Sequence, residues 1–230
     1  LGNTAMAIDY RNSQIFLVFR RKIALTNNAG IFAALTSTRT NGDWQNNDEF
    51  VITTFTEVAS AGTGANDGQN GNLNPTTYSF VISNNSLTTF RDFGTTSVIT
   101  RGMGLAAVPN SLFLGRRRDG SSPIPAEIFM GEVIVYNRVL SATENRQIQD
   151  YLALKWGLQL NVPLAHPFKY NPPTMRMFQP VDIEACALWL DAADLSTILP
   201  SNITSGTAIV QWQDKSASAT FAIPQRGASG

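Results

Sequence analysis

The sequence GEVIVYNRVLSATENRQIQDYLALKWG, residues 131–157, runs from a strand-like segment into a helix-like one. Its apolar, β-branched first part predicts a long strand over 127–136. Ser141 and Glu144 have the spacing of a capping box, in which each side chain accepts a hydrogen bond from the other residue's backbone N–H. An apolar stripe at helical spacing follows, made of Ile148, Tyr151, Leu152 and Trp156. Gly157 is a typical helix stop, so we expect one amphipathic helix packed against β-structure.

Toward the N-terminus, short apolar segments alternate with polar turns, as in an all-β domain. The run 14–20 is continuously apolar and rich in Val, Ile and Phe, which predicts a central strand buried on both faces. Further strands are expected at 30–36, 50–56, 78–82, 87–90, 96–100, 104–108 and 111–115. Residues 60–76 are rich in Gly and Asn, and we expect a long loop there.

The C-terminal part changes in character. Residues 159–182 are punctuated by prolines and lack a hydrophobic period, which predicts an extended linker. Fully extended, this linker could reach about 70 Å. Two more strands are expected after it, at 187–190 and 208–212.

Two segments resemble concanavalin-A-like, laminin-G-like jelly-roll domains. Residues 111–158 are similar to the end of such a domain at Glu132, Tyr136, Leu140, Ser141, Glu144, Tyr151, Leu152, Lys155, Trp156 and Gly157. Residues 187–225 contain ALWLDAADLST and VQWQDKS and resemble its beginning, although Ala217 stands where the family usually has Gly. The resemblance implies an all-β antiparallel β-sandwich of the tandem-repeat type, with one C-terminal amphipathic helix.

In this chain the end of the domain precedes the beginning. We therefore expect a sandwich over 1–158 that lacks its first strands, a linker over 159–182, and the beginning of a sandwich repeat over 183–230. The last part can complete its own lobe, complete a neighbouring one, or open a second domain. Contacts of residues 188–190 with 127–136 would support the first alternative. We also expect Phe16, Val133 and Trp189 to lie in facing antiparallel layers.

Composition excludes several classes of function. The 230 residues carry 17 basic and 17 acidic side chains, and a net charge of zero argues against nucleic acid as a partner. No apolar run approaches the roughly 20 residues that a membrane-spanning helix needs, so we expect no membrane insertion. Cys186 is the only cysteine, which excludes an intrachain disulfide, and we expect it to be a small buried apolar residue. Neutral charge favours protein subunits of an assembly as partners.

The sequence offers no catalytic constellation. Glycosidases on this fold carry carboxylates at alternating strand positions, and no such set is present. The only histidine, His166, lies in the predicted linker and is not close in sequence to a nucleophile. We therefore expect no enzyme and no cofactor. Calcium is the one ion left open, with the 66–72 loop, the pair Asp191/Asp194 and the pair Asp214/Ser216 as candidate ligands.

A few polar-loop residues are candidates for contact with a ligand or partner. Trp44 lies in a polar stretch and could stack on a sugar or anchor a partner, the alternative being a ring folded back on the sheet. Asn66 and Asp67 belong to the Gly/Asn-rich loop. A basic run could bind an acidic partner surface, the alternative being a solvated turn; it consists of Arg116, Arg117 and Arg118.

These observations favour a non-enzymatic structural or interaction module of a larger assembly. The resemblance extends to tandem domains of large DNA virus particles and bacterial surface proteins, which implies a minor capsid or virion surface component, located in a virion or on a cell surface. The alternative is a carbohydrate-binding lectin or adhesion domain, with glycans as partners. In that case Trp44 and the 60–76 loop would form the site at the rim of the sandwich.

Overall fold

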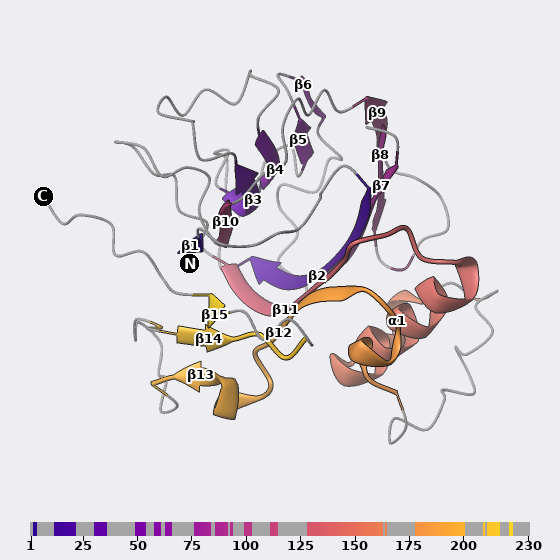
Figure 1. Ribbon diagram of the computed structural model, residues 1–230. Coiled ribbons are helices and arrows are strands. Elements are labelled where there is room, and N and C mark those ends of the chain that lie inside the picture. The colour runs from indigo at the N-terminus through magenta and orange to yellow at the C-terminus, as the bar shows by residue number, and fades with distance from the viewer. Residues whose placement is uncertain are drawn as a thin grey trace, which may run out of the picture.

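The computed structural model describes residues 2–3, 12–21, 30–35, 49–53, 58–60, 63–65, 76–83, 86–91, 93, 99–102, 111–114, 128–162, 164, 178–200, 209, 211–216 and 221–222. Two six-stranded sheets form its body (Figure 1), and all their strand pairs are antiparallel. The expected all-β antiparallel class is therefore correct.

The first sheet has the order β1-β10-β3-β4-β5-β6. Its strands are Gly2–Asn3, Ser111–Leu114, Gly30–Leu35, Glu49–Thr53, Val58–Ser60 and Thr63–Ala65, in that order. The second sheet has the order β12-β11-β2-β7-β8-β9. Its strands are Cys186–Asp191, Ile128–Tyr136, Ser13–Arg21, Thr76–Ser83, Ser86–Arg91 and Ile99–Gly102.

Smaller elements complete the described part of the fold. A three-stranded sheet has the order β13-β14-β15 and consists of Ile198–Leu199, Gln211–Gln213 and Phe221–Ala222. The 3-10 helices are η1 (Gln159–Asn161), η3 (Pro180–Asp182) and η4 (Leu195–Thr197). Within the described residues, no helix has the length and apolar character that crossing a bilayer requires.

The α-helix α1 (Ala142–Lys155) begins at the predicted capping box. The Ser141 hydroxyl accepts from the backbone N–H of Glu144 at 3.3 Å, and the Ser141 N–H donates to the Glu144 carboxylate at 2.9 Å. Arg138 adds an ion pair to the same carboxylate at 2.6 Å. Gly157 follows the helix with a φ of 67°, a left-handed conformation that glycine adopts without a steric penalty.

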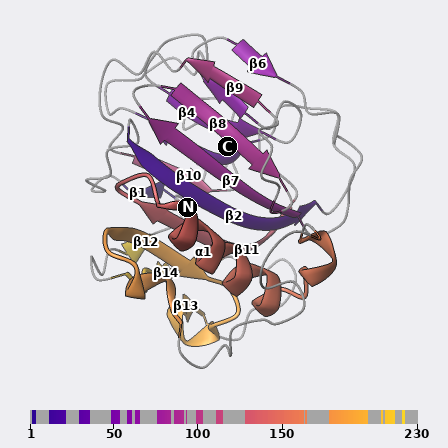
Figure 2. The same cartoon turned by 90° about the vertical axis from the view of Figure 1, so that its right-hand side faces the viewer.

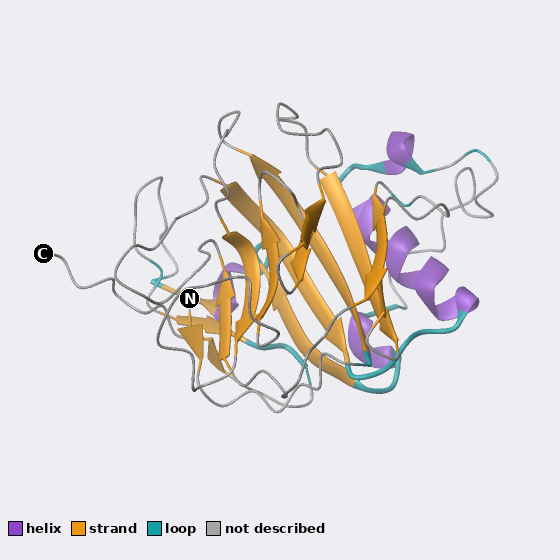
Figure 3. Cartoon of the chain, turned by 90° about the horizontal axis from the view of Figure 1, so that it is seen from above, coloured by secondary structure: helices purple, strands orange, loops and turns teal. Residues whose placement is uncertain are grey.

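Strand β2 lies in the middle of the second sheet (Figure 2). Its side chains are buried on both faces, as its apolar run predicts. On the face toward α1, Ile134 of β11 lies opposite Phe16 of β2 and Trp189 of β12, and all three belong to one core cluster with the helix. On the other face, Val133 lies opposite Leu17 and Leu190, and these side chains are fully buried. Figure 3 shows α1 beside the strand layers.

The C-terminal segment joins this same sheet. Strand β12 pairs antiparallel with β11, from Glu132 opposite Asp191 to Tyr136 opposite Cys186. The expectation that Phe16, Val133 and Trp189 lie in facing layers is therefore wrong. They lie on three neighbouring strands of one sheet, because β12 extends the β11 edge by hydrogen bonding and does not cross to the other sheet.

Several expectations differ in part from the observed elements, among them the strand at 96–100, which is observed at Ile99–Gly102. The expected loop over 60–76 contains β6 and the end of β5. The expected strand at 208–212 is shorter and shifted, since β14 spans Gln211–Gln213. The linker over 159–182 includes η1 and η3 at its two ends, and Val162 is buried there. The expected strand at 104–108 lies outside the described residues.

Candidate functional site

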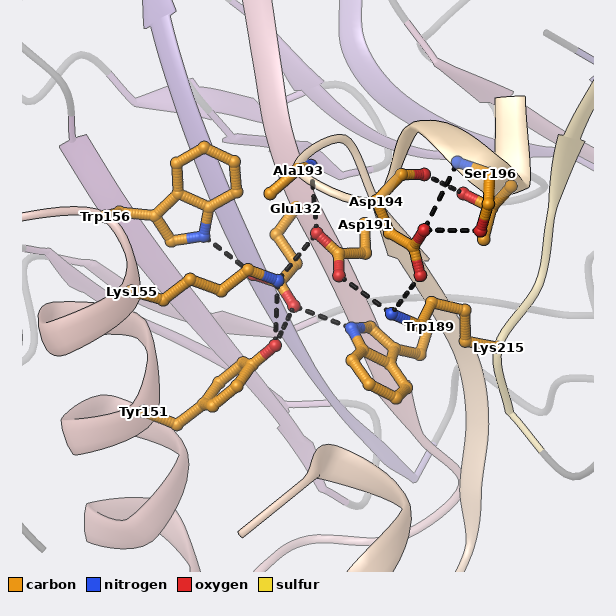
Figure 4. Close-up of polar contacts among 11 residues, drawn as sticks. Glu132, Tyr151, Lys155, Trp156, Trp189, Asp191, Ala193, Asp194, Ser196 and Lys215 are labelled. Carbon is orange, nitrogen blue, oxygen red and sulfur yellow. Dashed lines mark hydrogen bonds and ion pairs between the residues drawn. The ribbon is translucent and has the colours of Figure 1, made fainter. Parts of the chain in front are cut away.

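A cluster of polar side chains lies where α1, β11, β12 and residues 214–216 meet (Figure 4). We call it the polar cluster; it consists of Glu132, Tyr151, Lys155, Trp156, Trp189, Asp191, Asp194, Ser196 and Lys215. The two segments that carry the sequence resemblance supply all of these residues. Residues far apart in the chain thus form one interaction network.

Glu132 is the buried centre of the polar cluster and is only 1% exposed. Its Oε1 accepts from the Tyr151 hydroxyl at 2.8 Å and from the Trp189 indole N–H at 2.6 Å. Its Oε2 accepts from the Trp156 indole N–H at 2.7 Å and lies 3.2 Å from the Lys155 ammonium. Burial raises the pKa of Glu132, while the charge of Lys155 opposes that rise. Both carboxylate oxygens are engaged by structural donors.

Asp191 lies directly opposite Glu132 across the β11–β12 pair. Two carboxylates in such a position repel each other unless a cation lies between them. The Lys155 ammonium takes that role, at 2.6 Å from Asp191 Oδ1 and 3.2 Å from Glu132 Oε2. Burial alone would raise the pKa of Asp191, but hydrogen bonds from Lys155 and Lys215 outweigh it, so this pKa lies below its usual value.

Lys215 neutralises the outer part of the polar cluster. Its ammonium lies 3.0 Å from Asp191 Oδ2 and 2.8 Å from Asp194 Oδ2, and 4.3 Å from the centre of the Trp189 ring. The hydrogen bond from Lys215 lowers the pKa of Asp194 to about 2, and bonds from Ser196 add to this effect. Cations and carboxylates alternate through the network, so each of these charges lies beside an opposite one and the elements that carry them are linked by charge-assisted hydrogen bonds.

The candidate calcium ligands near this cluster already have protein partners. A cation at Asp191 and Asp194 would have to displace the Lys215 ammonium from between them. Asp214 accepts hydrogen bonds from the Trp189 N–H and from Ser216, which is the role of a turn cap. In the part of the chain that the structure describes, no group of three or more His, Cys, Asp or Glu side chains could hold a metal ion.

Gly131 allows the helix end to approach β11 closely. A shift in the β11–β2 register falls between Met130 and Glu132, and Gly131 lies at this bulge. A Cβ at Gly131 would lie 3.2 Å from the Trp156 ring and 3.2 Å from the Val18 carbonyl oxygen. The missing side chain therefore gives the Trp156 ring its place on the strand, from which its N–H reaches Glu132.

The contact residues proposed from the sequence lie outside the described part of the chain: Trp44, Asn66, Asp67, Arg116, Arg117 and Arg118. From the sequence, Glu132 and Lys155 stand out only as family-like residues, and Asp191 only as a calcium candidate. These residues become neighbours only through the β11–β12 pairing, which the local sequence patterns do not predict. Sequence reasoning also missed an exposed pair, in which the Arg20 guanidinium lies 4.6 Å from the centre of the Phe129 ring.

The chain matches no protein-family model, and no curated protein matches its sequence. Among solved structures it is similar to the Trypanosoma rangeli sialidase in complex with sialic acid, with 13% identity and a TM-score of 0.43 over 62% of this chain and 23% of that one. The match thus spans less than a quarter of the sialidase. It is also similar to the CBM40 of the Ruminococcus gnavus IT-sialidase, with 16% identity and a TM-score of 0.38 over 59% of this chain and 81% of that one. The same CBM40 bound to α2,6-sialyllactose gives 16% identity and a TM-score of 0.36, over 61% and 82%.

Proposed function

We propose that this protein is a non-enzymatic β-sandwich module that works by binding, as an interaction part of a larger assembly. The observation that carries the proposal is the engagement of Glu132 by four donors in a site only 1% exposed. A general acid or nucleophile must reach a substrate atom within hydrogen-bond distance. Glu132 has no oxygen left for such a contact, so its raised pKa reflects structural burial.

An activity test separates this proposal from catalysis. Purified protein is incubated with a panel of oligosaccharides, including a sialoside, and release of reducing ends is followed. We expect no turnover from the wild type or from Glu132→Gln. Turnover by the wild type would overturn the proposal, and its loss in a folded Glu132→Gln variant would assign that turnover to Glu132. Circular dichroism of both proteins supplies the folding control.

A second candidate function, glycan binding, is favoured by the exposed Arg20–Phe129 pair. Phe129 is 48% exposed on β11, at a position beyond the β11–β12 pairing, and Arg20 is exposed directly opposite it on β2. An aromatic ring can stack on the apolar face of a sugar, and a guanidinium can hold a carboxylate or hydroxyl group beside it. Rigid strands position both groups, as a binding site requires.

A glycan array decides between the two candidates. The panel includes α2,6-sialyllactose, the ligand named for the R. gnavus CBM40. Saturable binding that disappears in Phe129→Ala or Trp44→Ala would favour the lectin function. Leu195→Ala is the matched control, because Leu195 is 52% exposed and is not the ring that Arg20 contacts. Absence of binding to every glycan would favour the protein-assembly function. A virion or cell-surface setting is part of our proposal and rests on the sequence resemblance.

A further inference from the structure

We propose that residues 178–216, here called the docking segment, are exchangeable between molecules, so that the docking segment of a second copy of this chain can bind the β11 edge. The inference rests on the proposed interaction function and names the partner. Its starting point is the position of β12, which is the edge strand of its sheet and, among the described strands, pairs with β11 alone.

Hydrogen bonds and an ion pair within the docking segment hold its parts together. The Trp189 N–H donates to Asp214 Oδ1 at 2.9 Å, and the Lys215 N–H donates to the Trp189 carbonyl at 2.8 Å. The Lys215 ammonium holds Asp194 at 2.8 Å. These bonds join β12 to residues 214–216 without any contribution from the rest of the chain. The docking segment can therefore keep much of its arrangement when it leaves β11.

The part of the chain to which the docking segment binds, β11 with α1, also holds partners for its own buried charge, the Glu132 carboxylate. Three of the donors to Glu132 belong to α1 or to its C-cap: Tyr151, Lys155 and Trp156. Removal of the docking segment takes away only the Trp189 indole N–H from this carboxylate. An unpaired buried charge would make separation costly, and here that cost is small because Glu132 keeps its other donors.

The contacts that cross between the two sides do not depend on which molecule supplies them. They include the β11–β12 hydrogen bonds, the Trp189–Glu132 bond, the Lys155–Asp191 ion pair at 2.6 Å, and the bond from the Tyr136 hydroxyl to the Pro180 carbonyl at 2.8 Å. Without β12, the edge of β11 would expose unpaired backbone groups beside apolar side chains, which is a template for another strand. Exchange of identical elements re-forms the same contacts in a dimer.

The connection between the docking segment and the preceding part of the chain, which carries β11 and α1, allows this exchange. Residues 165–177 join them, and about thirteen residues span at most about 45 Å when extended. The protein has a net charge of zero, so two copies do not repel each other over long distances. Exchange is therefore expected at high protein concentration, or after two copies refold together.

Disulfide trapping tests the exchange in the full chain, in a Cys186→Ser background. Val133 of β11 lies opposite Leu190 of β12, and opposed Cα atoms in antiparallel strands lie within the range that a disulfide spans. A Val133→Cys chain and a Leu190→Cys chain are denatured, mixed, and refolded in a glutathione buffer. We expect a disulfide-linked heterodimer that neither chain forms alone. Val135→Cys with Leu188→Cys repeats the test at a second opposed pair.

An intrachain disulfide serves as the control for the exchange test. A single chain carrying both Val133→Cys and Leu190→Cys should form an intrachain disulfide, which confirms that the variant folds with β12 on β11. An intrachain bond without any heterodimer would overturn the exchange and leave the proposed function standing. Failure of both bonds at both opposed pairs would overturn the β11–β12 pairing and the exchange with it. The activity and glycan tests remain independent of these results.

Discussion

Glu132 carries a negative charge that α1, its C-cap and β12 surround with donors. We predict that Glu132→Ala lowers the free energy of unfolding by about 3–5 kcal/mol, because the Lys155 ammonium and several buried donors lose their partner. Urea denaturation followed by tryptophan fluorescence measures the change. Glu184→Ala is the control, since Glu184 is exposed. A loss below about 1 kcal/mol, the usual size for an exposed pair, would contradict the structural role of Glu132.

Replacement of either of two glycines near the helix end by alanine should lower the stability of the protein, for a different physical reason in each case. Gly131→Ala places a Cβ 3.2 Å from the Trp156 ring and from a backbone oxygen, so we expect a loss of about 1–3 kcal/mol from overpacking. Gly157→Ala meets no atom within 4 Å, but its φ of 67° is strained for alanine, so we expect a loss of about 1 kcal/mol. Only the first variant should alter the fluorescence of Trp156. Gly157→Asn should recover part of the second loss, since asparagine tolerates this conformation.

Asp150 gives a pH dependence with a defined sign. Asp150 is 4% exposed, and burial raises its pKa from 3.8 to about 7, with Arg146 opposing the rise. The folded protein therefore holds this proton more tightly than the unfolded chain. The contribution to stability is complete below pH 3.8 and declines as the pH rises toward 7. We expect Asp150→Asn to have a higher Tm than the wild type at pH 8, with the difference shrinking toward pH 4. An equal difference at every pH would refute this.

The helix α1 depends on its first turn for local stability. Replacement of Ser141 by alanine removes the hydroxyl that accepts from the Glu144 N–H, and we expect a loss of about 1 kcal/mol. Thr143→Ala, at an exposed position in the same turn, is the control and should change the stability by less. Thermal denaturation by circular dichroism measures both. A larger loss for Thr143→Ala than for Ser141→Ala would contradict the capping role.

Elements with strong local patterns could be predicted from the sequence. The capping box and stop of α1 and the apolar run of β2 each have a physical cause within a few residues, and the structure confirms them. The polar cluster could not be predicted, because Glu132 and Asp191 become neighbours only through the β11–β12 pairing. Strand β6 was missed because its residues, TGA, lack the apolar and β-branched character by which strands are recognised.

Over the whole molecule, the polar cluster accounts for the placement of the family-like residues at two distant parts of the chain. The first segment supplies Glu132 and Lys155, and the second supplies Trp189, Asp191 and Lys215. Each segment pairs its own charges, and the Lys155–Asp191 ion pair and the Trp189–Glu132 hydrogen bond link the two segments. Together they join the sheet edge to the helix, so these family-like residues form a structural junction.

This junction should hold the molecule together even when the chain is cut. We predict that a protease site inserted between residues 165 and 177, once cleaved, leaves two fragments that elute together at the mass of the intact protein. The buried side chains of Leu188, Trp189 and Leu190 and the strand pairing would keep them associated. Unfolding of the cut protein becomes bimolecular, so its Tm should rise with protein concentration, whereas the Tm of the uncut monomer should not.

Trp189→Ala in the cut protein removes a buried ring and the hydrogen bond to Glu132, and should release the fragments. Separation of the wild-type fragments without denaturant would show that the junction is too weak to serve as an interaction surface.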